Sequence, residues 1–214
     1  MRKLLFITLL SISFLTSSEE TISRWMSDYF KRIHDHIGNE NYEKAQYELE
    51  MGNNNYFRGG RTYEAALLYQ LYGQFYAVQS QYTSAVPWFE KALATEKMPR
   101  IGAQEVRFQL AQTYFMIGKY ENVISLLDEF IRVGERYKYP VSARVNLLMS
   151  YSHGRLEQYE PSYFHIKQAN NKSDKPQLDW IEYAFSLAMK LENLDDAEDL
   201  GTRLLFLEPN KKKY

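Results

Sequence analysis

The chain has 214 residues, 45% of them hydrophobic and 25% charged, which suffices for a folded core and is not typical of a disordered protein. Its formal net charge of −1 argues against nucleic acid or acidic lipid as a partner bound mainly by electrostatics. The lack of cysteine excludes disulfides, thiol nucleophiles, cysteine-ligated metals and a lipid-modified N-terminal cysteine.

The N-terminus has the order of a secretory signal peptide. Arg2 and Lys3 precede an apolar run over residues 4–15, and the small residues 16–18 follow. A membrane anchor is the alternative, but a spanning helix needs roughly 20 apolar residues and this run has only about a dozen. We therefore predict a signal peptide over residues 1–18, cleaved after Ser18, a periplasmic location and no stable membrane insertion after cleavage.

Residues 19–60 carry a weak form of a pattern that becomes clear later in the chain. Tyr42 and Ala45 are in phase with that pattern within a half-match from Tyr29 to Leu49. We predict a degenerate first repeat that caps the array. Clusters of Gly, Asn and Pro predict helix breaks at residues 38–41, 52–55, 59–60, 99–102, 134–140, 170–176 and 209–210.

From residue 61 onward, large rings alternate with small residues at spacings that fit pairs of antiparallel helices, most clearly over residues 69–92 and again over 110–130. Apolar residues recur with helical periodicity, and no segment alternates as a strand would. The small position of the first helix falls on Gly73, Ala111 and Ser150, and then on the atypical Phe185. These positions are 38, 39 and 35 residues apart, slightly more than the roughly 34 of a tetratricopeptide repeat.

The predicted fold is therefore all-α, a right-handed α-solenoid of tetratricopeptide-like helix–turn–helix repeats. Residues 61–214 would hold about four repeats. In the last repeat, large and small positions are inverted at Phe185 and Gly201. No polar helix closes the final apolar face, so we expect the array to be incomplete at its C-terminal end.

Histidines are the side chains best suited to acid–base chemistry near neutral pH, and there are four. His34 and His36 are two residues apart and point to different sides of a helix. His153 and His165 can face each other across the helix pair of the third repeat, where we interpret them as packing residues. Because no further ligand or base lies at a fixed spacing, we predict no catalytic site, metal site or cofactor.

The first helix of each repeat would line the concave face of the solenoid. The register predicts a groove there that is rich in amides and aromatic rings and contains two arginines, a composition suited to an extended peptide or a partner helix. The alternative is that Phe108 and Phe115 fill the interior between repeats. The predicted groove residues are Gln70, Gln74, Phe108, Gln109, Gln112, Phe115, Arg144, Tyr151, Arg155, Tyr183 and Met189.

Several segments carry a more specific resemblance. They are TYEAALLYQLYGQFYAVQSQYTSAVPWFEKALATEKMP, QLAQTYFMIGKYENVISLLDEFI, the third repeat ending LEQY, the helix around Trp180, and the ending LFLEPNKKKY. Together they resemble the periplasmic tetratricopeptide proteins encoded beside TonB-type energy-transduction systems. The resemblance runs from about Tyr42 to Tyr214, and it implies a non-catalytic accessory of the TonB, ExbB and ExbD complex. It transfers no binding residue.

We therefore expect a non-enzymatic periplasmic scaffold that binds a protein or peptide, with TonB, ExbB or ExbD as candidate partners and no role for nucleic acid. Two alternatives remain open. One is a soluble repeat adaptor of cell-wall synthesis or outer-membrane biogenesis. The other is the regulatory repeat domain of a longer exported protein.

Overall fold

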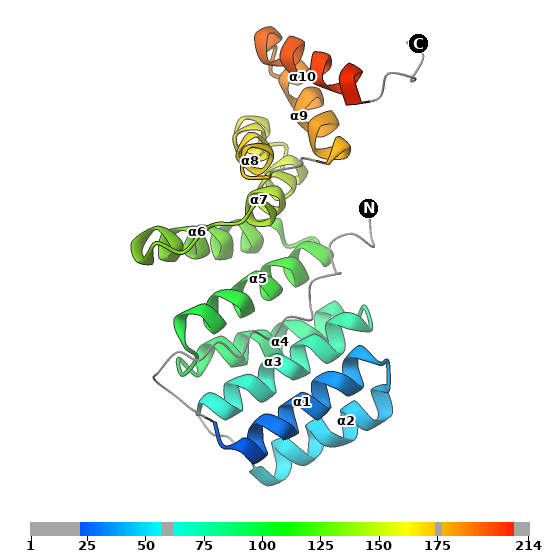
Figure 1. Ribbon diagram of the computed structural model, residues 1–214, viewed down its shortest axis with the longest axis vertical. Helices are drawn as coiled ribbons and strands as arrows, with labels where there is room; N and C mark the ends of the chain where they lie inside the picture. The colour runs from blue at the N-terminus through cyan, green and yellow to red at the C-terminus, as the bar shows by residue number, and fades with distance from the viewer. Residues whose placement is uncertain (1–21, 57–61, 174–176, 208–214) are drawn as a thin grey trace. The chain divides into compact units, whose positions relative to one another are not determined.

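The computed structural model describes residues 22–56, 62–173 and 177–207, and this part of the chain is entirely helical, with no strand (Figure 1). The predicted signal peptide, the predicted boundary at residues 60 and 61, and the chain end at 208–214 lie outside the described residues. Within the described ranges, no helix combines the length and the hydrophobicity that a membrane span requires.

The helices belong to two compact units, residues 1–119 and 120–214, in which α1 packs with α2, α3 with α4, α7 with α8 and α9 with α10 as hairpins. The first unit contains α1 (Arg24–Gly38), α2 (Tyr42–Met51), a π-helical turn (Gly52–Tyr56), α3 (Tyr63–Val78), α4 (Tyr82–Ala94) and α5 (Arg100–Met116). The second unit contains α6 (Tyr120–Tyr137), α7 (Ala143–Arg155), α8 (Tyr159–Asn171), α9 (Leu178–Lys190) and α10 (Leu194–Leu207).

One short turn ends six helices of the described residues. In each copy, the central residue has φ between 56° and 77°, and the next backbone N–H donates to the carbonyl five residues earlier at 2.8 to 2.9 Å, which closes the end of the preceding helix. One copy, at Lys138, ends α6, and the other five end α1, α3, α5, α7 and α9 at Glu40, Ser80, Gly118, Glu157 and Glu192. These five turns are 40, 38, 39 and 35 residues apart. The last three steps equal those predicted from the small-residue positions.

The small-residue positions lie where the two helices of a hairpin approach closely. A Cβ atom added to Gly73 would come within 2.6 Å of the Phe89 ring, so only glycine fits between α3 and α4. Ser150 and Ser162 join α7 to α8 by donating their hydroxyls to each other's backbone carbonyls, at 2.7 and 2.8 Å. These contacts confirm the predicted register in both hairpins.

The inverted pair in the last repeat is also a contact between two helices. The ring of Phe185 on α9 lies 3.4 Å from the position of a Cβ atom on Gly201 of α10. The large and the small residue have therefore changed places, and the hairpin still closes. This is the inversion that the sequence predicted.

One predicted break was wrong, and another begins later than predicted. At residues 52–55 the chain does not stop but continues α2 as a π-helical turn, with Gly52 packed under Leu68. At Gly134, α6 continues as far as Tyr137. A Cβ atom on Gly134 would lie 3.2 Å from Val141 and 3.3 Å from the carbonyl of Tyr139. Both glycines allow close packing. Because glycine also breaks helices, both positions were predicted from the sequence as helix ends.

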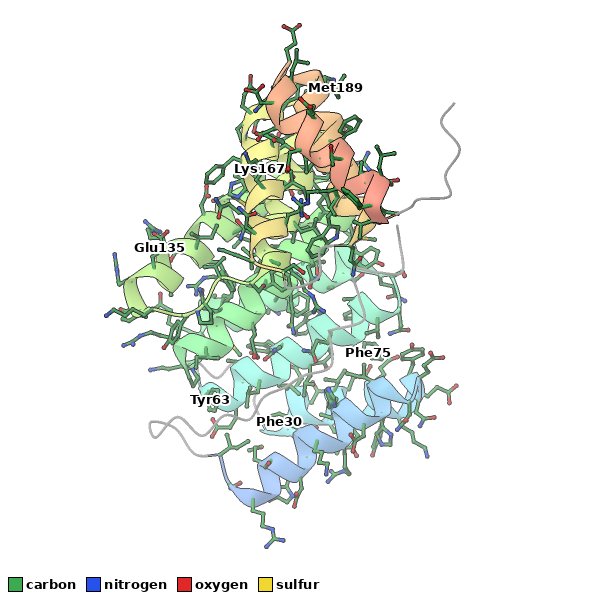
Figure 2. The ribbon with its side chains drawn as sticks, turned by 45° about the horizontal axis from the view of Figure 1, so that its top comes forward. Phe30, Tyr63, Phe75, Glu135, Lys167 and Met189 are labelled. Carbon is green, nitrogen blue, oxygen red and sulfur yellow. The ribbon has the colours of Figure 1, made fainter. Side chains whose placement is uncertain are left out.

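Each unit has its own apolar core. In the first unit, Phe30 and Ile33 of α1 are buried with Leu68 and Phe75 of α3, and Figure 2 shows the rings of Phe30 and Phe75 among the helices. In the second unit, Ile166 of α8 is buried in a cluster with residues of α9 and α10. Burying large apolar side chains is the main favourable contribution to folding, so each unit contributes its own share of the stability.

A polar cluster links the second helices of two neighbouring hairpins in the second unit. Asp196 of α10 accepts hydrogen bonds from Tyr163 and Lys167 of α8, both at 2.7 Å. Asn193 donates to the same carboxylate oxygen at 2.9 Å. These bonds lower the pKa of Asp196, the one to Lys167 most, and the ionised carboxylate fixes α10 against α8.

Candidate partner-binding surfaces

The predicted groove residues of the first unit do not form an open surface. Gln70 and Gln74 of α3 are only 4% and 2% exposed, and Gln112 of α5 is 7% exposed. Gln70 Nε2 donates to Gln109 Oε1 at 3.3 Å and so connects α3 with α5. Because α1, α2 and α4 also pack on α3, little of that helix is accessible. The expectation that Gln70, Gln74 and Gln112 are accessible was wrong.

Gln74 has a further peculiarity. Its Nε2 is buried and has no hydrogen-bond partner among the described residues. A buried donor left in this state costs stability. On α5, Phe108, Gln109 and Phe115 are half-buried, so part of each side chain is accessible. Whether these three bind a partner stays a prediction.

The second unit brings two of the predicted residues into contact. The rings of Tyr151 on α7 and Tyr183 on α9 lie 5.1 Å apart and are tilted by 57°. The Tyr183 hydroxyl is 3.0 Å from Ser162 Oγ, and it occupies the space that a Cβ atom on Gly154 would need. Burial, Asp179 and Tyr183 raise the pKa of Tyr151 to about 12, so this phenol is neutral at physiological pH.

Charged and apolar side chains are accessible on the same helices. Arg144 and Arg155 are exposed and lie seven residues before and four residues after Tyr151, which places all three on one side of α7. Met189 of α9 is 50% exposed, and its position on the outside is visible in Figure 2. We call Arg144, Tyr151, Arg155, Tyr183 and Met189 the tyrosine–arginine surface.

The two histidines of the third repeat do face each other, as predicted. Their rings are stacked, with centroids 5.6 Å apart and planes within 6° of parallel. His153 Nδ1 lies 2.6 Å from Gln158 Oε1, and His165 Nδ1 lies 3.3 Å from Asn146 Oδ1. Burial lowers the pKa of His165 to about 4, with further contributions from His153 and Lys172. The described residues contain no group of three or more metal-ligating side chains.

An open cleft of about 830 Å³ lies beside α6 in the second unit and was not predicted from the sequence. It lies between α6 and the turn from α7 to α8, and Leu156 and Gln158 of that turn line it. The sequence signal was a charged face on α6, which by itself is typical of any solvated helix. Only the folded chain places that face beside the turn.

No family model and no curated protein matches the sequence. Among solved structures, MamA from Desulfovibrio magneticus RS-1 is similar with a TM-score of 0.68 and 16% identity, over 90% of this chain and 100% of that one.

Another similar structure is YrrB, described as a TPR protein with an unusual peptide-binding site. It has a TM-score of 0.67 and 14% identity, over 86% of each chain. A Podospora anserina protein with nearly identical TPR-like repeats has a TM-score of 0.67 and 13% identity, over 86% of this chain and 94% of that one. The chain therefore has the all-helical fold of tetratricopeptide-repeat proteins.

Proposed function

We propose that this protein is an exported, non-catalytic scaffold of a cell-envelope assembly, which binds a segment of a partner protein on its tyrosine–arginine surface. The observation that carries the proposal is the half-buried pair Tyr151 and Tyr183 with Arg155 exposed beside it on α7. Tyrosine and arginine are enriched among the residues that dominate protein–protein binding energy. The repeat fold supports the same conclusion, since repeat arrays present extended binding surfaces.

The chemistry of this surface suggests what kind of segment it binds. Two guanidinium groups favour carboxylates, with which arginine forms paired hydrogen bonds. The two tyrosine rings beside Arg155, and the exposed Met189 on α9, offer apolar contact. We expect the partner segment to combine acidic with apolar or aromatic side chains.

We further propose that the assembly is a TonB–ExbB–ExbD transport system in the periplasm. The resemblance of residues 42–214 to periplasmic tetratricopeptide proteins encoded beside such systems supports this assignment. In this transport system the scaffold would hold a partner in place, and energy transduction would remain with that partner. We assign His153 and His165 a packing role, because amide side chains already engage a nitrogen of each ring.

The test is a pull-down from envelope extracts with the tagged mature chain, compared with the variant R155A/M189A. Both side chains are exposed, so their removal should leave the fold intact and reduce recovery of TonB, ExbB or ExbD. R203A, which alters an exposed arginine of α10, is the control.

Two results would contradict the proposal in different ways. Recovery of none of the three components would refute the TonB assignment. Recovery of cell-wall synthesis or outer-membrane assembly proteins would instead favour the adaptor alternative. Equal recovery with wild type and R155A/M189A would refute the tyrosine–arginine surface as the binding site.

A further inference from the structure

The cleft beside α6 has a mixed lining of charged and apolar side chains. Glu121, Asp128 and Glu129 bring three carboxylates to it, and Arg132 brings one guanidinium. Val123 and Leu127, which are fully buried, lie on the opposite side of the helix. The cleft is therefore built on the face of α6 that is not used for the core.

The negative charge of the cleft is only partly compensated. Arg132 forms an ion pair with Glu129 one turn away on α6. Glu121 and Asp128 are exposed and form no ion pair among the described residues. They are seven residues apart, which corresponds to about 10.5 Å along the axis of a helix. Two uncompensated carboxylates thus line the cleft at a defined separation.

Apolar side chains complete the lining. Ile124 and Leu126 come from α6, and Leu156 comes from the turn between α7 and α8. All three are half-buried, so each exposes apolar surface to the cleft. The amide of Gln158, also in the lining, is engaged by His153 Nδ1 at 2.6 Å, which fixes the edge that the turn provides.

We propose that this cleft is a second docking site, which binds a lysine- or arginine-bearing segment of a partner protein. Basic side chains would pair with Glu121 and Asp128, and an apolar side chain between them would contact Ile124 and Leu156. A segment in the polyproline II conformation has three residues per turn and rises about 3.1 Å per residue, so basic residues three positions apart lie on one face and span about 9 Å, close to the required distance. The opposite charge of the tyrosine–arginine surface means that the two sites select different segments.

Charge and geometry favour this occupant over other cations or surfaces. An acidic cleft repels anionic lipid and nucleic acid. A metal ion needs several converging oxygen ligands, and no group of three or more acidic or histidine side chains among the described residues is placed to hold one. A basic peptide satisfies both the carboxylates and the apolar lining.

The experiment uses residues 19–214 and a fluorescein-labelled peptide that carries two lysines three positions apart with leucine and isoleucine between them. A second peptide has glutamates in place of the lysines. Fluorescence anisotropy should show binding of the lysine peptide, weakened by salt. The variant E121K/D128K should bind the lysine peptide at least tenfold more weakly and should gain affinity for the glutamate peptide.

The control variant E135K/E160K changes the charge equally in the same unit and outside the cleft. Glu160 is the second residue of α8, as Glu121 is of α6, and Glu135 lies on α6 beyond the cleft, as labelled in Figure 2. It should retain most of the wild-type affinity, and circular dichroism should show equal helix content in all three proteins.

Two results would overturn the proposal. One is equal affinity of the wild type for the lysine and glutamate peptides. The other is an equal loss of affinity in E121K/D128K and E135K/E160K, which would show that the peptide responds to the net charge of the protein and not to the cleft. If the chain self-associates and E121K/D128K abolishes this association, the cleft binds a second copy of the chain instead of a partner segment. None of these measurements depends on TonB components, so their failure would not refute the proposed function.

Discussion

Replacing Gly154 by alanine should destabilise the second unit through one identified collision. The added Cβ atom would coincide with the Tyr183 hydroxyl, which is held 3.0 Å from Ser162 Oγ. Overpacking of this kind costs about 1–3 kcal/mol, and the higher helix propensity of alanine returns up to about 1 kcal/mol. We expect G154A to lose about 1–2 kcal/mol in unfolding free energy.

Removing the hydroxyl should reverse that loss. In Y183F the next neighbours of the added Cβ are Ser162 Oγ at 3.2 Å and the ring carbon Cζ of residue 183 at 3.4 Å, which small shifts accommodate. Y183F alone should cost about 1 kcal/mol for its lost hydrogen bond. The double variant G154A/Y183F should then be no less stable than Y183F, a coupling of about 1–3 kcal/mol.

Urea denaturation followed by circular dichroism at 222 nm measures all four proteins of this cycle. With a slope of about 1–3 kcal/mol per molar urea, G154A should lower the midpoint by about 0.5–1 M. An equal penalty for G154A in the wild-type and Y183F backgrounds would refute this collision. Additivity would mean that the hydroxyl is not what fills the space above Gly154.

Two further changes test the fold and the histidine pair. G73A should destabilise the first unit by about 1–3 kcal/mol, because Phe89 is fully buried and has no room to withdraw. G102A, whose Cβ would meet nothing within 4 Å, should be neutral or stabilising by up to about 1 kcal/mol in the same urea assay. Equal effects of G73A and G102A on stability would contradict the close contact between Gly73 and Phe89. Because the folded-state pKa of His165 lies near 4, below its ordinary 6.5, its stabilising contribution is complete above pH 6.5 and is lost as the pH falls toward 4. When the pH is lowered from 7.5 to 5, the unfolding free energy of the wild type, measured by heat or urea, should fall by about 1 kcal/mol more than that of H165Q, after allowance for the partial exposure of His165. Parallel plots of unfolding free energy against pH for the two proteins would refute the lowered pKa.

The period of the fold could be predicted from the sequence because close helix crossings tolerate few residue types. Gly73 and Ser150 lie at such crossings, and their spacing gave the register of the repeats. The exchange of Phe185 and Gly201 was also recognisable, since a large and a small residue changed places together. These features depend on local packing between helices that are neighbours in the chain.

The candidate binding residues were harder to predict. The repeat register placed Gln70 and Gln74 on an open concave face, but the other helices of the first unit cover them. The same register placed Tyr151 and Tyr183 on that face, and the structure brings their rings into contact. The cleft beside α6 was missed, because it needs Leu156 from a later turn as well as α6. Polarity along a helix does not tell which face its neighbours leave open.

The recurring turn has a consequence for how such chains diverge. Five of its six central residues are not glycine, although all six adopt the left-handed conformation. That conformation costs an ordinary residue roughly 1 kcal/mol or more, and the same backbone hydrogen bond closes each copy. The constraint therefore acts on the shape of the backbone and leaves residue identity largely unrestricted. Repeats of this kind can lose their sequence signature while they keep their geometry, and a search by turn spacing should recover them where a search by residue type fails.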